Sequence, residues 1–130
     1  MPVLDALPKR ILVVDDAGLV RLYYRSALER AGYCVDEALN GIEAMERVLS
    51  TPFDLLVLDV NMPQMDGLTF LRKLRAQEGG ESAIPVLMTS TEAKPDDVAA
   101  ALAAGANFYL VKPVAQPLLV EHVEMLCGPA

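Results

Sequence analysis

Acidic side chains close two of the apolar runs in this chain. "RILVVDD" ends in Asp15 and Asp16, and "LLVLD" ends in Asp59. Two other apolar runs, "IPVLMTS" and "NFYLVKP", end near Ser90 and Lys112. Three neighbouring carboxylates repel one another, which favours binding of a hard divalent cation such as Mg²⁺. Beside a cation and a lysine, one carboxylate, Asp59, is a candidate nucleophile for a phosphoryl group, whose charge the metal and Lys112 would stabilise.

Alternating strands and helices would bring these residues together. The apolar runs, with "YCVDEA" as the second in chain order, predict five short strands, and stretches of helical periodicity follow each of them. This alternation predicts an α/β fold, a doubly wound five-stranded parallel sheet with five helices. We expect the flavodoxin-like strand order 2-1-3-4-5 for this sheet. Because parallel strands present their carboxyl ends at one edge, we expect the polar residues to share that edge.

The periodicity also predicts which side of each helix faces the sheet. The inward residues expected are Leu19, Val20, Tyr23, Ala27 and Leu28 in the first helix, and Ile42, Met45, Val48 and Leu49 in the second. In the third they are Leu68, Leu71 and Leu74, and in the fourth Val98 and Leu102.

Length and composition are those of one compact domain. The chain has 130 residues, 53% of them hydrophobic, and we expect residues 1–9 to be an N-terminal extension and 10–127 the domain. A net charge of -7 argues against nucleic acid as a partner. No apolar stretch reaches the ~18 to 20 residues of a membrane helix, and the N-terminus lacks the order of a signal peptide, so we expect a cytoplasmic protein. Cys34 and Cys127 form no metal-binding pattern.

Four segments in order resemble one family. "ILVVDD", "LDVNMPQMDG", "PVLMTSTEAK" and "GANFYLVKP" are similar to the motifs of the receiver domain of two-component response regulators, most like the stand-alone chemotaxis (CheY-like) type. The resemblance covers nearly the whole chain. It implies a signalling switch rather than an enzyme, one that accepts a phosphoryl group from a histidine kinase or phosphotransfer protein and then binds a downstream protein.

The resemblance assigns roles to the site residues. It implies that Asp59 is the phosphoacceptor and a Mg²⁺ ligand, together with Asp16, with Asp15 through a water molecule, and with the backbone carbonyl of Asn61. Lys112 would pair with the phosphoryl group, and its bond to Pro113 would be cis.

Other residues would transmit or time the signal. The resemblance implies that the Ser90 hydroxyl moves to the phosphoryl oxygen and that Tyr109 swings inward behind it. Asn61 and Glu92, each two positions beyond a site residue, are expected to edge the path of the hydrolytic water. Thr91 departs from the small residue common at its position and would crowd that approach.

The output surface is expected on the fourth helix, fifth strand and fifth helix. There Ala99, Ala100 and Ala103 would turn outward and present a small-residue face to a partner protein, with the domain a monomer or a phosphorylation-dependent dimer. The lone histidine, His122, is expected to be structural.

Two other classes of protein compete with the switch. An aspartyl-nucleophile phosphatase would carry a second acid at the position of Asn61, and an amide cannot donate a proton as an acid does. An unphosphorylated scaffold or a flavin-binding relative would not need the acidic pair and the lysine. The switch accounts for all four segments.

Overall fold

The computed structural model describes residues 7–130, and its centre is one parallel sheet. The strands are β1 (Arg10–Val14), β2 (Cys34–Ala38), β3 (Leu55–Asp59), β4 (Val86–Ser90) and β5 (Phe108–Val111). They pair in the order β2-β1-β3-β4-β5, every neighbouring pair parallel. The predicted flavodoxin-like fold and strand order are therefore confirmed.

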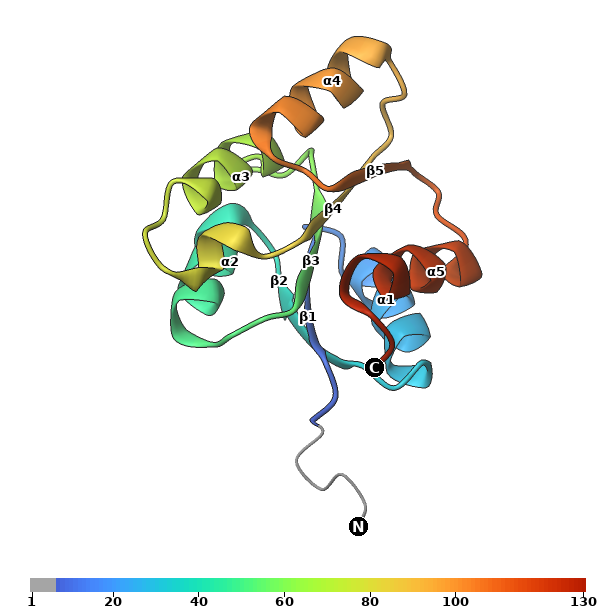
Figure 1. The fold of residues 1–130 in the computed structure, drawn as a ribbon. Helices are drawn as coiled ribbons and strands as arrows, with labels where there is room; N and C mark the ends of the chain where they lie inside the picture. Colours follow the sequence, from blue (N-terminus) through green and yellow to red (C-terminus); the bar gives the residue numbers. More distant parts are fainter. Residues whose placement is uncertain (1–6) are drawn as a thin grey trace.

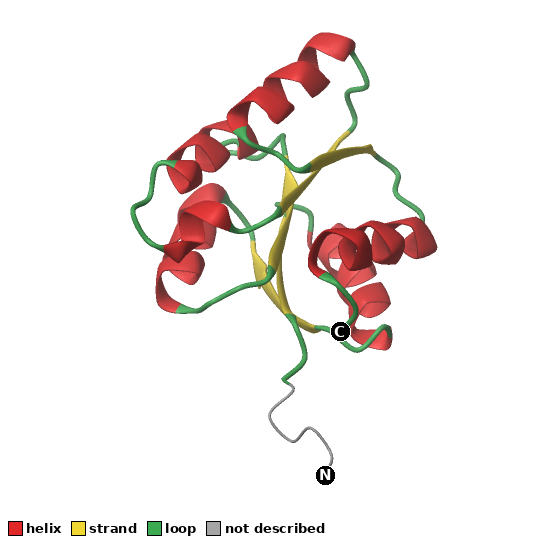
Figure 2. Cartoon of the chain, in the orientation of Figure 1, coloured by secondary structure: helices red, strands yellow, loops and turns green. Residues whose placement is uncertain are grey.

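Helices cover both faces of the sheet (Figures 1 and 2). On one face lie α1 (Gly18–Arg30) and α5 (Gln116–Cys127), and on the other lie α2 (Gly41–Ser50), α3 (Gly67–Arg75) and α4 (Pro95–Ala104). A short 3-10 helix, Gly80–Ala83, precedes β4. Each face has its own apolar core, so the strands between the two layers are almost continuously hydrophobic.

Local sequence signals explain where several helices begin and end. The Asn40 side chain accepts a hydrogen bond from the Glu43 amide at the start of α2, and Asp66 accepts one from the Thr69 amide at the start of α3. The helix α4 begins at Pro95 and is followed by Gly105 at a φ of 110°, a left-handed conformation that favours glycine. These ends place the loops that carry the polar residues at one edge of the sheet.

The predicted inward faces of three helices are only partly correct: Ala27, Leu28 and Val48 are buried as expected, but other residues are not. Leu102 of α4 is 50% exposed, and its neighbour Ala101 is fully buried against the sheet. In α1, Leu19 and Tyr23 are exposed and Tyr24 is buried; in α2, Ile42 and Leu49 are exposed and Ala44 is buried with Val48. Small side chains let α2 and α4 approach closely, so alanines rather than the larger neighbouring residues face inward.

The third helix is as predicted, with Leu71 and Leu74 buried and Leu68 half-buried against the core. Both cysteines are unpaired and half-buried. Within residues 7–130, none of the helices combines the length and the apolar character that crossing a bilayer requires. Most of the expected N-terminal extension, residues 1–6, lies outside the described residues.

Candidate functional site

The carboxylates of Asp15 and Asp59 lie side by side at the carboxyl edge of the sheet. Val13 and Val57, two residues before them, face the α1 and α5 layer. Because side chains alternate along a strand, Asp15 and Asp59 continue the same two columns toward the sheet edge. Both are almost fully buried, at 1% and 4% exposure, whereas Asp16 is exposed. The guanidinium of Arg21 donates to the Asp15 carbonyl at 2.7 Å and fixes the loop between β1 and α1.

Lys112 makes ion pairs with both buried carboxylates. Its ammonium Nζ lies 2.7 Å from Asp15 Oδ2 and 3.2 Å from Asp59 Oδ1. The other oxygen of Asp15 accepts a hydrogen bond from the Ala17 amide at 2.9 Å. The lysine therefore offsets part of the repulsion between the two acids.

The phosphoacceptor predicted from the sequence, Asp59, has a strongly perturbed acidity. The pKa of its carboxyl is raised from 3.8 to about 6, chiefly by burial and next by the negative charge of Asp15, while Lys112 and the backbone amide of Asn61 act to lower it. The net direction shows that burial and the neighbouring acid outweigh the lysine. An additional cation would stabilise the charged form of this carboxylate.

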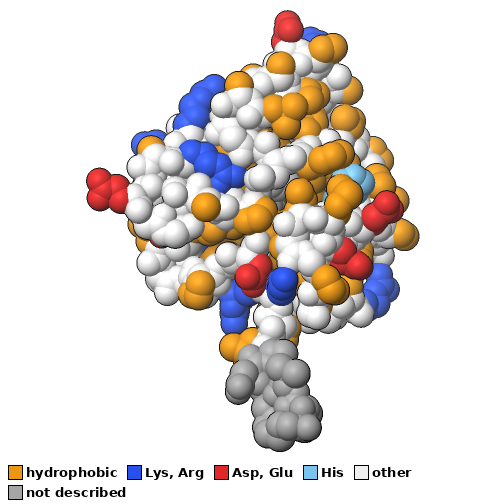
Figure 3. Space-filling view, in the orientation of Figure 1, with side chains coloured by type: hydrophobic (Ala, Val, Ile, Leu, Met, Phe, Trp, Pro, Cys, Tyr) orange, Lys and Arg blue, Asp and Glu red, His pale blue; other side chains and the backbone are white. Residues whose placement is uncertain are grey.

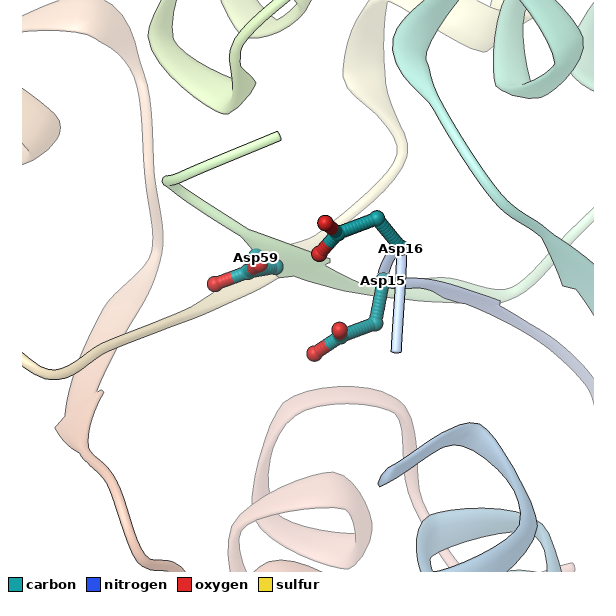
Figure 4. Close-up of side chains that lie close together, drawn as sticks. All are labelled: Asp15, Asp16 and Asp59. Atoms are coloured by element: carbon teal, nitrogen blue, oxygen red, sulfur yellow. The ribbon is translucent and has the colours of Figure 1, made fainter. Parts of the chain in front are cut away.

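The three predicted metal ligands with carboxylate side chains form one cluster. Carboxylate oxygens of Asp15, Asp16 and Asp59 lie within 4.8 Å of one another, and Figure 4 shows the side chains projecting together from the ends of β1 and β3. All the ligand atoms are hard oxygens, and one acid is open to solvent, which suits an ion that keeps several waters. The residues present therefore fit Mg²⁺.

The loop after β3 is held tightly beneath Asp59. The Gly67 amide donates to the Val60 carbonyl at 2.8 Å. A Cβ at Gly67 would lie 2.3 Å from the Asp59 carbonyl oxygen, so only glycine fits there. Asn61 is exposed in this loop, where its amide reaches Asp59, and Met62 is buried.

Ser90 and Tyr109 lie on the opposite side of the sheet edge from Asp15. Ser90 Oγ accepts a hydrogen bond from the Glu92 amide at 3.0 Å, and the half-buried Tyr109 donates its hydroxyl to the Glu92 carbonyl at 2.8 Å. Asn61 joins these three residues in lining a small cavity of about 70 Å³. Both predicted switch residues and both residues expected to time the signal therefore share one cavity.

The remaining predictions around the site can also be placed. The Lys112–Pro113 bond is cis, as the resemblance implies. Thr91 is exposed and lines, with Lys112, the pocket next to the site. His122 packs its ring on Phe108, with centroids 4.7 Å apart, and its Nδ1 donates to the Leu118 carbonyl, which suits a structural role.

Two residues beside the site were missed from the sequence. Thr89 lies directly opposite Asp59 in the register of β3 and β4, and Tyr24 of α1 is buried next to it. The available signal was alternation: Thr89 is two residues beyond the inward Leu87, and therefore shares a face with Asp59.

A comparison with protein-family models matches residues 11–124 to the response regulator receiver domain. The chain is 39% identical over 121 residues to the chemotaxis protein CheY1 of Helicobacter pylori strain J99, covering 92% of this chain and 97% of that protein. It is 38% identical over 122 residues to the sensor protein EvgS of Escherichia coli K12, of which it spans only 10%.

Solved structures agree with these relatives. The Vibrio cholerae chemotaxis protein CheY4 superposes with a TM-score of 0.86 at 33% identity, covering 92% of this chain and 98% of that one. A response regulator from Chloroflexus aurantiacus gives a TM-score of 0.88 at 32% identity, covering 93% and 98%. With its acidic pocket beside Lys112, the chain belongs to the response regulator receiver domains, CheY-like signalling switches of two-component systems rather than true enzymes.

Proposed function

We propose that this domain is a phosphorylation-activated switch that accepts a phosphoryl group from a histidine kinase or phosphotransfer protein on Asp59. The observation that carries the proposal is the buried Asp59 carboxylate, paired with Lys112 at 3.2 Å and clustered with Asp15 and Asp16. A bare surface acid would have neither a cation partner nor a metal-binding neighbourhood. We also expect the cytoplasm to be its site of action, since the kinase partner phosphorylates it there.

In the transfer, an oxygen of the Asp59 carboxylate attacks phosphorus. The bond between phosphorus and the donor nitrogen breaks, and the imidazole of the donor histidine leaves with that electron pair and its proton. Asp59 then carries an acyl phosphate, and the Lys112 ammonium pairs with a phosphoryl oxygen. Asp15, Asp16, Asp59 and the Asn61 carbonyl would hold Mg²⁺, which supplies positive charge to the transferring group when bound.

The transfer can be tested with a small phosphodonor. Incubation with acetyl phosphate and Mg²⁺ should add one phosphoryl group, read as a mass gain of one HPO₃ unit on the intact protein. Asp59→Asn should abolish the gain, and Asp16→Ala should raise the Mg²⁺ concentration that it requires. Equal labelling of Asp59→Asn and the wild-type protein would overturn the assignment and leave an unphosphorylated scaffold as the better description.

Phosphorylation would act through Ser90 and Tyr109. A phosphoryl oxygen would attract the Ser90 hydroxyl away from the Glu92 amide, and Tyr109 would move into the space that this opens, shifting a two-state equilibrium. Ser90→Ala should accept the phosphoryl group at a rate similar to that of the wild-type protein and yet fail to switch. A phosphorylation-induced change in the Tyr109 environment that survives in Ser90→Ala would contradict this coupling.

The lifetime of the acyl phosphate would depend on Asn61 and Glu92. Both are exposed and line the small cavity next to Ser90, where water can reach the phosphoryl group. Replacing both with bulky or basic residues should change the dephosphorylation rate, measured as loss of the HPO₃ mass after the donor is removed. An unaltered rate would place the path of the water elsewhere.

The downstream partner would bind the α4–β5–α5 face, defined here by its exposed apolar residues Leu102, Phe108, Val111 and Leu118. Hydrophobic side chains gather over α4 and toward α5 in Figure 3. Tyr109 lies in the middle of this face, on β5, so its movement would reshape the surface. The test below distinguishes a different protein from a second copy of this one as the partner.

The placement of the alanines modifies the expected surface. Ala100 and Ala103 line a groove between α3 and α4 together with Arg72 and Arg75, on the other flank of α4 from Leu102. Leu102→Arg should therefore remove phosphorylation-dependent binding in a pull-down from native extract and any phosphorylation-dependent dimer in sedimentation. Ala103→Arg is the matched control; loss of binding in Ala103→Arg alone would move the output surface to the groove.

A further inference from the structure

The hydroxyl of Thr89 is buried beside the phosphorylation site and has no hydrogen-bond partner. Thr89 is 0% exposed, and its Oγ1 makes no hydrogen bond with any residue between 7 and 130. A hydroxyl left unpaired in the interior lowers stability, and a valine of similar shape would avoid that loss. The presence of a hydroxyl here therefore calls for a physical reason.

Alternation along β4 places Thr89 in the same row as the catalytic acids. Leu87 packs in the α1 and α5 core with Val57, its neighbour on β3. Two residues further on, Thr89 pairs in register with Asp59. Thr89 therefore lies on the Asp59 side of the sheet, and the next residue, Ser90, points to the opposite side.

Tyr24 reaches this row from α1. It is 2% exposed and packs in the same core as Leu87. Burial raises the pKa of its hydroxyl, and the negative charge of Asp15 acts in the same direction. The positive charge of Lys112 and the neighbouring Thr89 hydroxyl act to lower this pKa. The phenol oxygen is thus beside Thr89 and within the field of the site, and Tyr24 and Lys112 both line one open pocket of about 610 Å³.

The Lys112 ammonium has a donor to spare. A lysine has three N–H donors, and Asp15 and Asp59 accept two of them. Both acids lie at the carboxyl ends of strands, Asp15 after β1 and Asp59 in β3. Neither contacts the ammonium from α1, the helix that carries Tyr24. Tyrosine and threonine hydroxyls each donate one hydrogen bond and can also accept one. When the Tyr24 hydroxyl donates to Thr89, the phenol oxygen can still accept an N–H from the lysine.

Building on the proposed function, we propose that Tyr24 and Thr89 are positioning residues for Lys112. In the reacting protein, a rotation of the two side chains brings their hydroxyls into a mutual hydrogen bond that the resting structure lacks, and the Tyr24 oxygen then accepts the third N–H of the ammonium and keeps it directed at Asp59. Neither hydroxyl touches the phosphoryl group. The pair acts through the lysine alone.

The test measures the rate of phosphorylation by acetyl phosphate at saturating Mg²⁺ as a function of phosphodonor concentration. Tyr24→Phe and Thr89→Val should each lower the maximal rate about fivefold, the equivalent of one net hydrogen bond, with little change in the half-saturating concentration. Thr89→Ser, which keeps the hydroxyl, should restore most of the rate. Tyr23→Phe is the matched control, because Tyr23 is the exposed neighbour on the same helix and should react normally.

A stability measurement separates positioning from folding. Thr89→Val removes an unpaired buried hydroxyl, so its urea midpoint should equal or exceed that of the wild-type protein while its reaction is slower. A lower midpoint together with the slower reaction would instead assign Thr89 a packing role and overturn the proposal.

A double-mutant cycle tests whether the effect passes through the lysine. In a Lys112→Ala background, Tyr24→Phe should cause no further loss of rate. A fivefold loss that persists there, or wild-type rates for both Tyr24→Phe and Thr89→Val, would overturn the proposal. Absence of any phosphorylation in the wild-type protein would instead refute the proposed function, so the two failures are distinguishable.

Discussion

The proposed phosphorylation site around Asp59 and the α4–β5–α5 face are neighbouring regions with opposite construction. At the site, Asp15 and Asp59 are buried, share one lysine within 3.2 Å, and rest on a loop in which Gly67 leaves no space for a side chain. On the face, Leu102 and Val111 are large apolar residues exposed to solvent. The site is therefore closely packed around its two buried acids, whereas the face has surface available for another protein.

This difference suggests a division of tolerance to mutation. A buried and closely packed site should lose stability or chemistry with most changes, because little space is left for a side chain of another shape. An exposed apolar face should accept substitutions that leave both folding and phosphorylation intact. Four changes test this division, in decreasing order of expected effect.

Gly67→Ala should be the most damaging substitution. The added Cβ would lie 2.3 Å from the Asp59 carbonyl oxygen and 2.9 Å from Val60 Cα, and backbone atoms cannot rotate aside as a side chain can. We expect the free energy of unfolding to fall by roughly 3 kcal/mol or more, measured by urea denaturation. Gly80→Ala is the matched control, since a Cβ there meets nothing within 4 Å. Equal losses in the two variants would mean that the loop beneath Asp59 is not tightly held.

Asp59→Asn should stabilise the metal-free protein in a pH-dependent way. Because the folded-state pKa of Asp59 is raised from 3.8 to about 6, ionisation opposes folding: the effect is absent below 3.8, grows as pH rises to 6, and is constant above. At pH 7.5 the variant should therefore be more stable than the wild-type protein by up to about 3 kcal/mol. At pH 4 the two should unfold at nearly the same urea concentration.

Magnesium provides the control for this prediction. Added Mg²⁺ should stabilise the wild-type protein more than Asp59→Asn, since the ion binds the ionised carboxylate of the folded state. The difference at pH 7.5 would then shrink. A difference between the two proteins that is the same at pH 4 and pH 7.5 would show that Asp59 is not the group whose burial opposes folding.

The sequence predicted which polar residues lie together better than it predicted which side of each helix faces the sheet, for a physical reason. Asp15, Asp59 and Lys112 each follow a short buried strand, and parallel strands must present their carboxyl ends at one edge. The topology alone therefore brings these residues together. The expected strand order is also observed, whereas the register of the strands was not predicted.

Helix faces are less strongly determined by the sequence. In α4, Val98, Ala101 and Leu102 are all compatible with an inward stripe, and the spacing of four residues from Val98 led to the prediction of Leu102. The structure selects Ala101, because a close approach of the helix to the sheet favours a small side chain. Tyr24 was likewise indistinguishable from Tyr23 by type, and the prediction placed Tyr23 inward where the structure buries Tyr24. Successive residues point about 100° apart around a helix axis, so residue type and period could not decide which of two neighbours faces the sheet.

A pair of substitutions in α4 tests whether Ala101, rather than Leu102, faces the sheet. Ala101→Leu should cost about 1 to 3 kcal/mol, since Ala101 is fully buried and the extra atoms must displace the core. Leu102→Ala should change stability by less than about 0.5 kcal/mol, because half of that side chain already contacts water. Both are read from urea denaturation of the unphosphorylated protein. If Leu102→Ala were the more costly of the two, Leu102 would belong to the core, and the output surface would lose its central residue.

Tyr109→Phe should have only a small effect on stability, and it tests the boundary between the two regions. The Tyr109 hydroxyl donates to the Glu92 carbonyl at 2.8 Å and so ties β5 to the loop after β4, but the bond lies at the surface, where water can replace it. We expect a loss of less than about 1 kcal/mol in unfolding free energy and an unchanged rate of phosphorylation by acetyl phosphate. The ring remains to occupy the space that Ser90 would vacate, so phosphorylation-dependent binding at the α4–β5–α5 face should weaken less than in Tyr109→Ala. A loss of 2 kcal/mol or more, or a slower reaction at Asp59, would show instead that the face is held as rigidly as the site and that the two regions are one cooperative unit.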